Sequence, residues 1–519
     1  MLSDVTTPHD LDDRFRAALS ALGDPARRRD PAEPLSDRAP LTGAQALALF
    51  DAQVTSRLLD LAGRWLRSFG EGFYTIGSAG HEGNAAVAAA LRPTDPALLH
   101  YRSGAFYCVR AAQAAGTFPT DPGLAVRESD AATSDGEDAG TSEEDEPITL
   151  NLTRPDSEEA SSDPGPIGPE GVRRDDEVVP SDEDQGTAVP EAESVPVGAG
   201  VAVDAAGEAV VGAPAEPRAA LATPDAYTEA ARDVLRGMVA SAREPIAGGR
   251  HKVFGRADLA VIPTTSTIAS HLPRAVGMGL ALERLRKVGP GARRTGLVVG
   301  IGDADGATSS PWPPDAIVVC SFGDASVNHA SATAAFNTAG WYDHTGLRIP
   351  VLFVCEDNGL AISVRSPQGW VAATLRAKPG IRYFAADGTD PVEAYRVAGE
   401  AAAWVRRHRR PAVLHLTTVR LMGHAGADAE TAYRSAAEIA ADAERDPLLV
   451  TARLLVEGGF ASGDELLARY DERGWQVRRV AEEVLDEPKL TSPAEVVAAL
   501  APRRPARISR AVAEAAARA

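Results

Sequence analysis

Two short polar segments each follow a run of apolar residues, and both carry oxygen atoms of the kind that a metal ion takes as ligands. Gly-Asp-Ala at 323–325 follows the run 316–322, and Glu-Asp-Asn-Gly at 356–359 follows the run 351–355. Ligands of open α/β sheets bind beyond the carboxyl ends of the strands. Mg²⁺ prefers a few protein oxygens together with the oxygens of a bound phosphate. Asp324 and Asn358 therefore predict a metal–diphosphate site.

Each segment alone also fits an ordinary structural role. Asp324 could be a helix N-cap, and the Asn-Gly pair that begins at Asn358 is common in turns. Together they are more specific, because the small-residue helical segment 330–340 joins the two strand ends. A third acidic segment, 302–306, follows an apolar run as well. It is rejected because the proline-rich residues 309–314 come next, where no helix can begin.

The elements that must position these residues alternate along the chain. Continuous apolar runs, which are typical of strands buried on both faces, lie at residues 297–301, 316–322, 351–355 and 412–419. Helical patterns lie at residues 41–68, 84–91, 224–243, 269–287 and, in a mostly helical region, 446–487. We therefore predict an α/β fold with a parallel sheet flanked by helices.

The net charge of −20 belongs to one segment. Residues 121–220 carry 26 acidic residues, five arginines, and no lysine or aromatic residue, so their charge is −21 and that of the remainder is +1. Such a segment buries too little apolar surface to fold, so an acidic insertion at 119–222 is expected to be disordered and to serve as a tether or insertion. A nucleic-acid partner is not expected.

The expected organisation has five parts. These are a flexible N-terminal extension (1–40), the first part of the main domain (41–118), the insertion (119–222), the rest of the domain with C-terminal helices (223–487) and a C-terminal tail (488–519). No run of apolar residues reaches the length of a membrane span, and the N-terminus lacks the basic and apolar regions of a secretory signal. Three cysteines without metal-like spacing favour a reducing compartment, so a cytoplasmic location is expected.

Three further motifs complete a resemblance to a known family. They are Tyr101-Arg102, the loop 265–273 and Arg-Leu-Met-Gly-His at 420–424. With the two strand-end segments, they make the chain similar to the alpha subunit of the decarboxylating component of thiamine-diphosphate-dependent 2-oxo acid dehydrogenases, in particular the branched-chain (2-oxoisovalerate) type. The resemblance covers nearly everything outside residues 1–40 and the acidic insertion, and it implies the family's thiamine-diphosphate-binding fold.

The resemblance implies a role for each matching residue. Asp324, Asn358 and the carbonyl of Leu360 are expected to ligate Mg²⁺. Arg102, Arg420 and His424 are expected to neutralise the diphosphate, with His424 also near the reacting carbonyl as the catalytic candidate. The full expected set of cofactor contacts is Tyr101, Arg102, Ser266, Ile268, Gly323, Asp324, Ala325, Asn358, Leu360, Ile362, Arg420 and His424. Ser266 and Ile268 are matched to the family's contacts with the aminopyrimidine ring.

The chain departs from the family pattern at four positions. Ala325 replaces a glycine, and residues 342–348 lengthen the connection between the two metal-binding segments, which we expect to be absorbed as a loop. His271 stands where the branched-chain pattern has glutamine, so a monovalent cation site is left open. Ala425 stands where mammalian enzymes carry a phosphorylated serine, so that switch is expected to be absent.

The resemblance implies oxidative decarboxylation of a 2-oxo acid and transfer of the acyl group to a lipoyl domain of the acyltransferase component. In this family the carboxylate that activates the cofactor comes from a beta subunit or a fused beta half. We therefore expect this chain to be inactive alone and to work in an α₂β₂ assembly. Pyruvate or acetoin as the substrate, and a non-catalytic thiamine-diphosphate-binding assembly protein, are the alternatives.

Overall fold

The computed structural model describes residues 8–35, 40–73, 76–119, 225–250, 252–264, 266–292, 312–426, 428–500 and 510. These residues belong to one unit, Met1–Ser134 with Ala222–Ala519. The strand predicted at 297–301 and the rejected acidic segment at 302–306 lie outside the described residues. So does all but the first residue of the predicted insertion 119–222.

A five-stranded sheet lies at the centre of this unit. Its strands are β1 (Ala97–Leu98), β2 (Val318–Gly323), β3 (Val351–Asp357), β4 (Arg382–Asp387) and β5 (Ala412–Thr417). All pairings are parallel, in the order β1-β2-β3-β5-β4. The predicted fold class is confirmed, and the predicted runs 316–322, 351–355 and 412–419 correspond to β2, β3 and β5.

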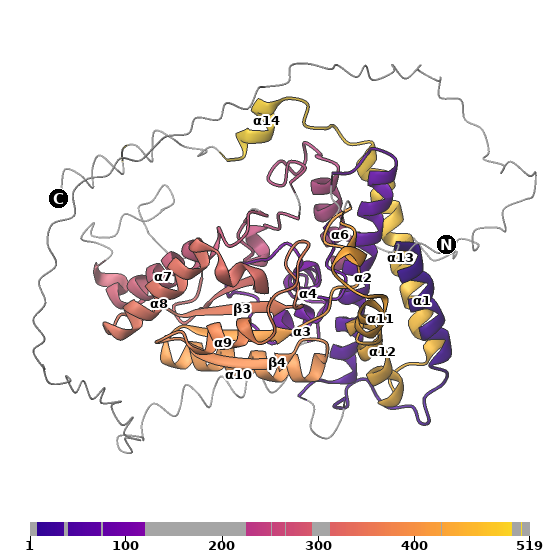
Figure 1. Ribbon diagram of the computed structural model, residues 1–519, viewed down its shortest axis with the longest axis horizontal. Helices are drawn as coiled ribbons and strands as arrows, with labels where there is room; N and C mark the ends of the chain where they lie inside the picture. The colour runs from indigo at the N-terminus through magenta and orange to yellow at the C-terminus, as the bar shows by residue number, and fades with distance from the viewer. Residues whose placement is uncertain are drawn as a thin grey trace, which may run out of the picture. The chain divides into compact units, whose positions relative to one another are not determined.

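Helices cover both faces of the sheet. Side chains alternate between the faces of a strand, so Val319, Leu352 and Leu414 point into one apolar cluster and Val318, Phe353 and Val413 into the other. The first cluster includes α3 (Asn84–Ala89), α4 (Gly104–Ala114) and α10 (Pro391–His408). The second includes α7 (Leu272–Ala292), α8 (Ala330–His344) and α9 (Trp370–Arg376). Figure 1 shows α7 and α8 on one side of β3 and α10 on the other.

A second group of helices packs beside this sandwich. It consists of α1 (Pro8–Ala21), α2 (Gly43–Ser68), α6 (Ala226–Met238), α11 (Ala436–Glu444), α12 (Pro447–Glu457) and α13 (Gly463–Leu485). Its centre is the long helix α2, which packs against α13, α4 and α6 (Figure 1). The short helix α14 (Pro493–Ala498) has no buried residue. Tyr107 of α4 donates to Asp233 of α6 at 2.8 Å, so the parts of the chain before and after the insertion form one core.

The expectation of a flexible extension over residues 1–40 is wrong for residues 8–21, which form α1. Leu11, Phe15 and Leu19 of α1 are buried, and Figure 1 shows α1 alongside α13. Arg16 pairs with Asp471 of α13 at 2.6 Å. The spacing of four residues between the buried side chains is that of one helical face. Three aspartates and a proline in the same stretch made the segment look polar.

Three short 3₁₀ helices complete the described elements: η2 (Ala257–Leu259), η4 (Asp324–Asn328) and η5 (Glu430–Ala432). Helix α7 begins at Leu272, three residues later than the pattern predicted, because Ala269 adopts a left-handed backbone conformation (φ 57°) that ends the loop before the helix. The predicted helix 330–340 extends as α8 to His344. The connection 342–348, which was expected to be a loop, is therefore helical over residues 342–344, and only its second part turns, at Gly346 (φ 80°).

Candidate active site

The predicted site residues lie just beyond the carboxyl ends of four strands. Asp324 follows β2, Asn358 follows β3, Arg420 follows β5, and Tyr101 and Arg102 follow β1. All four strands are parallel, so these ends meet at one edge of the sheet. Register reinforces this, because Gly323 at the end of β2 pairs with Glu356 near the end of β3. The order β1-β2-β3-β5 thus gathers segments that are far apart in the sequence.

One pocket brings together ten of the twelve expected cofactor contacts. These are Tyr101, Arg102, Ile268, Gly323, Asp324, Ala325, Asn358, Leu360, Ile362 and His424. Ser266 lies instead in an adjoining pocket, whose walls share His100, Tyr101 and Ile268 with the first. Arg420 does not line either pocket. It lies behind the wall and donates to the carbonyl of Ala361 at 3.0 Å.

The acidic end of the pocket is built around Asp324. Its side chain is buried, and Ser366 donates to its Oδ2 at 2.5 Å. Burial, with a further contribution from the negative charge of Asp357, raises the pKa of Asp324 to about 7. A divalent cation bound at Asp324 would offset both the burial of its carboxylate and the negative charge of Asp357 nearby. The donor set therefore fits Mg²⁺.

Asn358 is held at both ends of its carboxamide. Its Oδ1 accepts from the backbone N–H of Leu360 at 3.0 Å, and its Nδ2 donates to Nε2 of His81 at 2.8 Å. Gly359 completes the turn with a positive φ of 70°, which glycine adopts without strain. The turn places Leu360 in the wall of the pocket, where its carbonyl was expected to face the metal.

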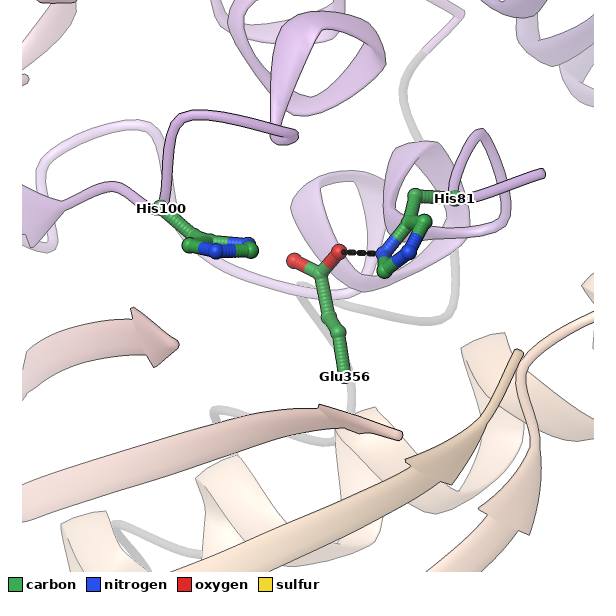
Figure 2. Close-up of side chains that lie close together, drawn as sticks. All are labelled: His81, His100 and Glu356. Carbon is green, nitrogen blue, oxygen red and sulfur yellow. Dashed lines mark hydrogen bonds and ion pairs between the residues drawn. The ribbon is translucent and has the colours of Figure 1, made fainter. Parts of the chain in front are cut away.

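Behind Asn358, a buried cluster joins His81, His100 and Glu356, whose ligand atoms lie within 4.8 Å of one another. Figure 2 shows the two imidazoles on either side of the Glu356 carboxylate, with the bond from His81 marked. His81 Nδ1 lies 2.7 Å from Glu356 Oε2, and Ser103 donates to Glu356 Oε1 at 3.1 Å. Burial lowers the pKa of both histidines. Of the two imidazoles, only His81 is hydrogen-bonded to the carboxylate; within the described residues, Nδ1 of His100 has no hydrogen-bond partner.

Arg102 and His424 also line the pocket. Arg102 is only 3% exposed, and it donates to the carbonyl of Gly77 and, at 3.0 Å, to Nδ1 of His424. Burial and the nearby charge of Arg102 lower the pKa of Arg420. Within the described part of the chain, Nε of Arg420 and Nε of Arg64 have no hydrogen-bond partner. Buried guanidinium groups without enough acceptors fit an anion such as a diphosphate.

The loop that carries His424 is fixed by an acidic residue. Asp428 Oδ2 accepts from the backbone N–H of His424 at 2.7 Å and from the hydroxyl of Tyr433, and it lies 3.5 Å from Nη2 of Arg420. Asp428 and Tyr433 follow the Arg-x-x-x-His segment in the sequence, so the motif acts as one hydrogen-bonded unit.

His271, the residue at the open cation position, lies in the wall of the Ser266 pocket. Its Nε2 donates to the carbonyl of Ser321 at 2.7 Å, and burial lowers its pKa. Within the described residues Nδ1 of His271 has no hydrogen-bond partner. The monovalent cation stays a prediction.

Sequence reasoning missed His81, Glu356 and Ser366 as parts of this site. Glu356 stands inside a segment that the sequence singles out, but nothing there gives it a partner. His81 lies in a glycine-rich loop, and its contacts with Glu356 and Asn358 span more than 270 residues. Ser366 is an ordinary serine in the loop between β3 and α9. Only the strand order brings these residues together.

No helix in the described ranges is long and apolar enough to cross a membrane. Among known proteins, a 2-oxoisovalerate dehydrogenase subunit alpha of Bacillus subtilis (strain 168) is 25% identical over 267 residues, which is 50% of this chain and 70% of that protein. A mitochondrial 2-oxoisovalerate dehydrogenase subunit alpha 2 of Arabidopsis thaliana is 28% identical over 244 residues, 46% of this chain and 45% of that protein.

A pyruvate dehydrogenase E1 component subunit alpha of Rickettsia felis is 31% identical over 147 residues, 28% of this chain and 43% of that protein. The chain thus spans less than half the length of the plant and rickettsial relatives that it matches. The family model described as dehydrogenase E1 component matches residues 225–492, just over half of the chain. The chain belongs to the dehydrogenase E1 component family.

Proposed function

We propose that this chain is the alpha subunit of a 2-oxo acid dehydrogenase, with thiamine diphosphate and Mg²⁺ bound at the pocket beyond the strand ends. One observation carries the proposal. A carboxylate and a carboxamide on neighbouring strand ends share a single pocket with a buried arginine and a histidine. That arrangement supplies both metal ligands and anion ligands in one pocket. A scaffold would need neither.

The chain's own residues divide the binding between them. Asp324, Asn358 and the carbonyl of Leu360 would hold Mg²⁺, and Arg102 with His424 would hold the diphosphate. Arg420 would add its charge from behind the wall. The adjoining pocket, with Ser266 and Ile268, would take the ring end of the molecule. When bound, thiamine diphosphate supplies the carbon nucleophile for decarboxylation of a 2-oxo acid, while the protein binds and orients it.

The proposed reaction is oxidative decarboxylation of a branched-chain 2-oxo acid, with transfer of the acyl group to a lipoyl domain. The names of the relatives in Bacillus subtilis and Arabidopsis thaliana support the branched-chain type. A pyruvate-type subunit is the second candidate, favoured by the 31% identity with the rickettsial protein. Acetoin is a further substrate to assay. The three buried, unpaired cysteines support a reducing compartment, and the cytoplasm is proposed on that ground.

A beta subunit is part of the proposal. The described residues that line the Ser266 pocket include histidines, serines and apolar groups but no carboxylate. A carboxylate facing the ring end would then come from a partner, in an α₂β₂ assembly.

The test is an assay of the purified full chain, the beta partner and a lipoyl domain, alone and in combination. We expect acyl transfer to the lipoyl domain only when all are present, and a higher kcat/KM for 2-oxoisovalerate than for pyruvate or acetoin. A preference for pyruvate would select the second candidate. Decarboxylation by this chain alone would contradict the requirement for a partner. Cofactor binding without any turnover in the complete mixture would select the non-catalytic alternative.

A further inference from the structure

His81 occupies a position that the proposed chemistry does not yet use. It is 1% exposed and belongs to the glycine-rich loop before α3. Both ring nitrogens are engaged: Nδ1 with Glu356 Oε2 at 2.7 Å and Nε2 with Asn358 Nδ2 at 2.8 Å. The ring therefore links a buried carboxylate to the carboxamide that is a proposed metal ligand.

The carboxylate decides where the ring carries its proton. Glu356 accepts hydrogen bonds from Ser103 at Oε1 and from Asn84 at Oε2. With Oε2 as an acceptor, His81 presents its N–H at Nδ1. In a neutral imidazole the other nitrogen is then an acceptor, and Nε2 can only receive a hydrogen from a neighbour. The two donors Ser103 and Asn84 also fix the carboxylate in place. Glu356 thus determines which nitrogen of His81 carries the proton, and His81 in turn determines which end of the Asn358 carboxamide faces it.

This order selects one of the two orientations of the Asn358 side chain. In the observed orientation Nδ2 gives a hydrogen to His81, and Oδ1 accepts from the N–H of Leu360. Rotation of the amide by half a turn would place an oxygen against the lone pair of His81 and an NH₂ group against the N–H of Leu360. Both hydrogen bonds would become repulsive contacts. Oδ1, which has a second lone pair, therefore stays on the side of Leu360.

We propose that His81 is a positioning residue that, together with Glu356, locks the carboxamide of Asn358 so that its oxygen and not its nitrogen is presented to Mg²⁺. The inference rests on the proposed function, because it assigns a role toward the metal of that site. Groups that orient a metal ligand from behind typically contribute a factor of about 10 to 100 in metal affinity. The ligand atoms of His81, His100 and Glu356 lie close enough together to resemble a second metal site. Both ring nitrogens of His81 are, however, already used in hydrogen bonds.

The experiment measures the Mg²⁺ concentration that gives half of the rise in melting temperature of the full chain at saturating thiamine diphosphate. We expect His81→Leu to raise this concentration about 10- to 100-fold, because Asn358 is then free to turn. His81→Gln carries a donor and an acceptor on one planar group and should stay within a few-fold of the wild type. Tyr470→Phe, which removes a partly buried hydrogen bond between α13 and α1, serves as a matched control with unchanged Mg²⁺ dependence.

A double-mutant cycle separates positioning from a general loss of stability. Asn358→Asp has two equivalent oxygens, so the direction in which the side chain is turned no longer matters. In that background an oxygen already faces Nε2 of His81, so His81→Leu should not raise the Mg²⁺ requirement, whereas independent effects would multiply. Equal losses in both backgrounds, or a wild-type requirement in His81→Leu, would overturn this inference alone. A wild-type chain with no Mg²⁺-dependent response would overturn the proposed function and the inference with it.

Discussion

Replacement of Asp324 by asparagine should make the protein more stable while it abolishes the response to the cofactor. Asp324 is buried at the end of β2 and faces the charge of Asp357. Without a cation, this carboxylate destabilises the folded state. The substituted asparagine would be uncharged, and its carbonyl oxygen could still accept the hydrogen bond from Ser366. The substitution therefore removes an electrostatic cost and one metal ligand at the same time.

The size of the gain follows from the pKa. The pKa of Asp324 rises from 3.8 to about 7 on folding, so the folded state binds more protons than the unfolded state between these values. Its contribution to stability is thus intact below pH 3.8 and is lost as the pH rises through about 7. Each unit corresponds to about 1.4 kcal/mol, which sets an upper value of about 4 kcal/mol for Asp324→Asn above pH 7. Near pH 5 the gain should fall to about 1.5 kcal/mol.

Urea unfolding of the metal-free full chain at both pH values measures this gain. Melting curves with thiamine diphosphate and Mg²⁺ then measure binding, since ligand at a hundred times its Kd stabilises the wild type by about 2.7 kcal/mol. The matched control is Asp343→Asn. Asp343 is a buried carboxylate outside the candidate pocket, and it pairs with Arg410 at 2.8 Å. This control should lose stability and keep the ligand response.

Two results for Asp324→Asn would contradict these expectations. If Asp324→Asn is less stable than the wild type at every pH, burial of this carboxylate is not a cost. If it keeps the full Mg²⁺-dependent rise in melting temperature, Asp324 is not a metal ligand.

Three further outcomes are expected. Isothermal titration with Mg²⁺ present should show about 100-fold weaker binding of thiamine diphosphate for Arg102→Ala and about tenfold weaker binding for Arg102→Lys, which keeps the charge but not the fork; equal affinities would contradict the diphosphate role. Burial lowers the pKa of His100 and His271, so below pH 6.5 the unfolded state binds more protons than the folded state. As the pH falls below 6.5, the free energy of unfolding should therefore decrease by up to about 1.4 kcal/mol per pH unit for each histidine. Urea unfolding between pH 6.5 and about 5 measures that slope, which His271→Gln should reduce. Arg57→Leu should cost about 3–5 kcal/mol, because it strips the partner from two buried carboxylates; a loss below about 1 kcal/mol in urea unfolding would argue against that network.

The central strands could be predicted because their burial on both faces demands continuous apolar sequence. The runs ending at Phe322 and Cys355 show this directly, since β2 and β3 are buried along almost their whole length. Strand β4 was not predicted because it lies at the edge of the sheet, where Ala386 is its only buried residue and Arg382 is exposed. Strand β1 has only two residues, too few for any pattern.

The site could be predicted as far as local motifs reach. Asp324, Asn358 and Arg102 each stand in a recognisable segment, and the pocket unites them. The contacts behind them could not be predicted, because they depend on strand order and loop geometry. His81 reaches Asn358 only because the loop before α3 lies over the end of β3. Arg420 was expected in the pocket itself but lies one layer behind, where it holds the carbonyl of Ala361.

The central claim is that this chain contributes the metal and diphosphate ligands of a thiamine-diphosphate enzyme whose activating group lies on a partner. Reconstitution tests it most directly: decarboxylation of 2-oxoisovalerate measured for the wild-type chain and for Asp324→Asn, each with and without the beta partner. The account predicts turnover only for the wild-type chain with its partner. Turnover that survives Asp324→Asn, or that needs no partner, would contradict it.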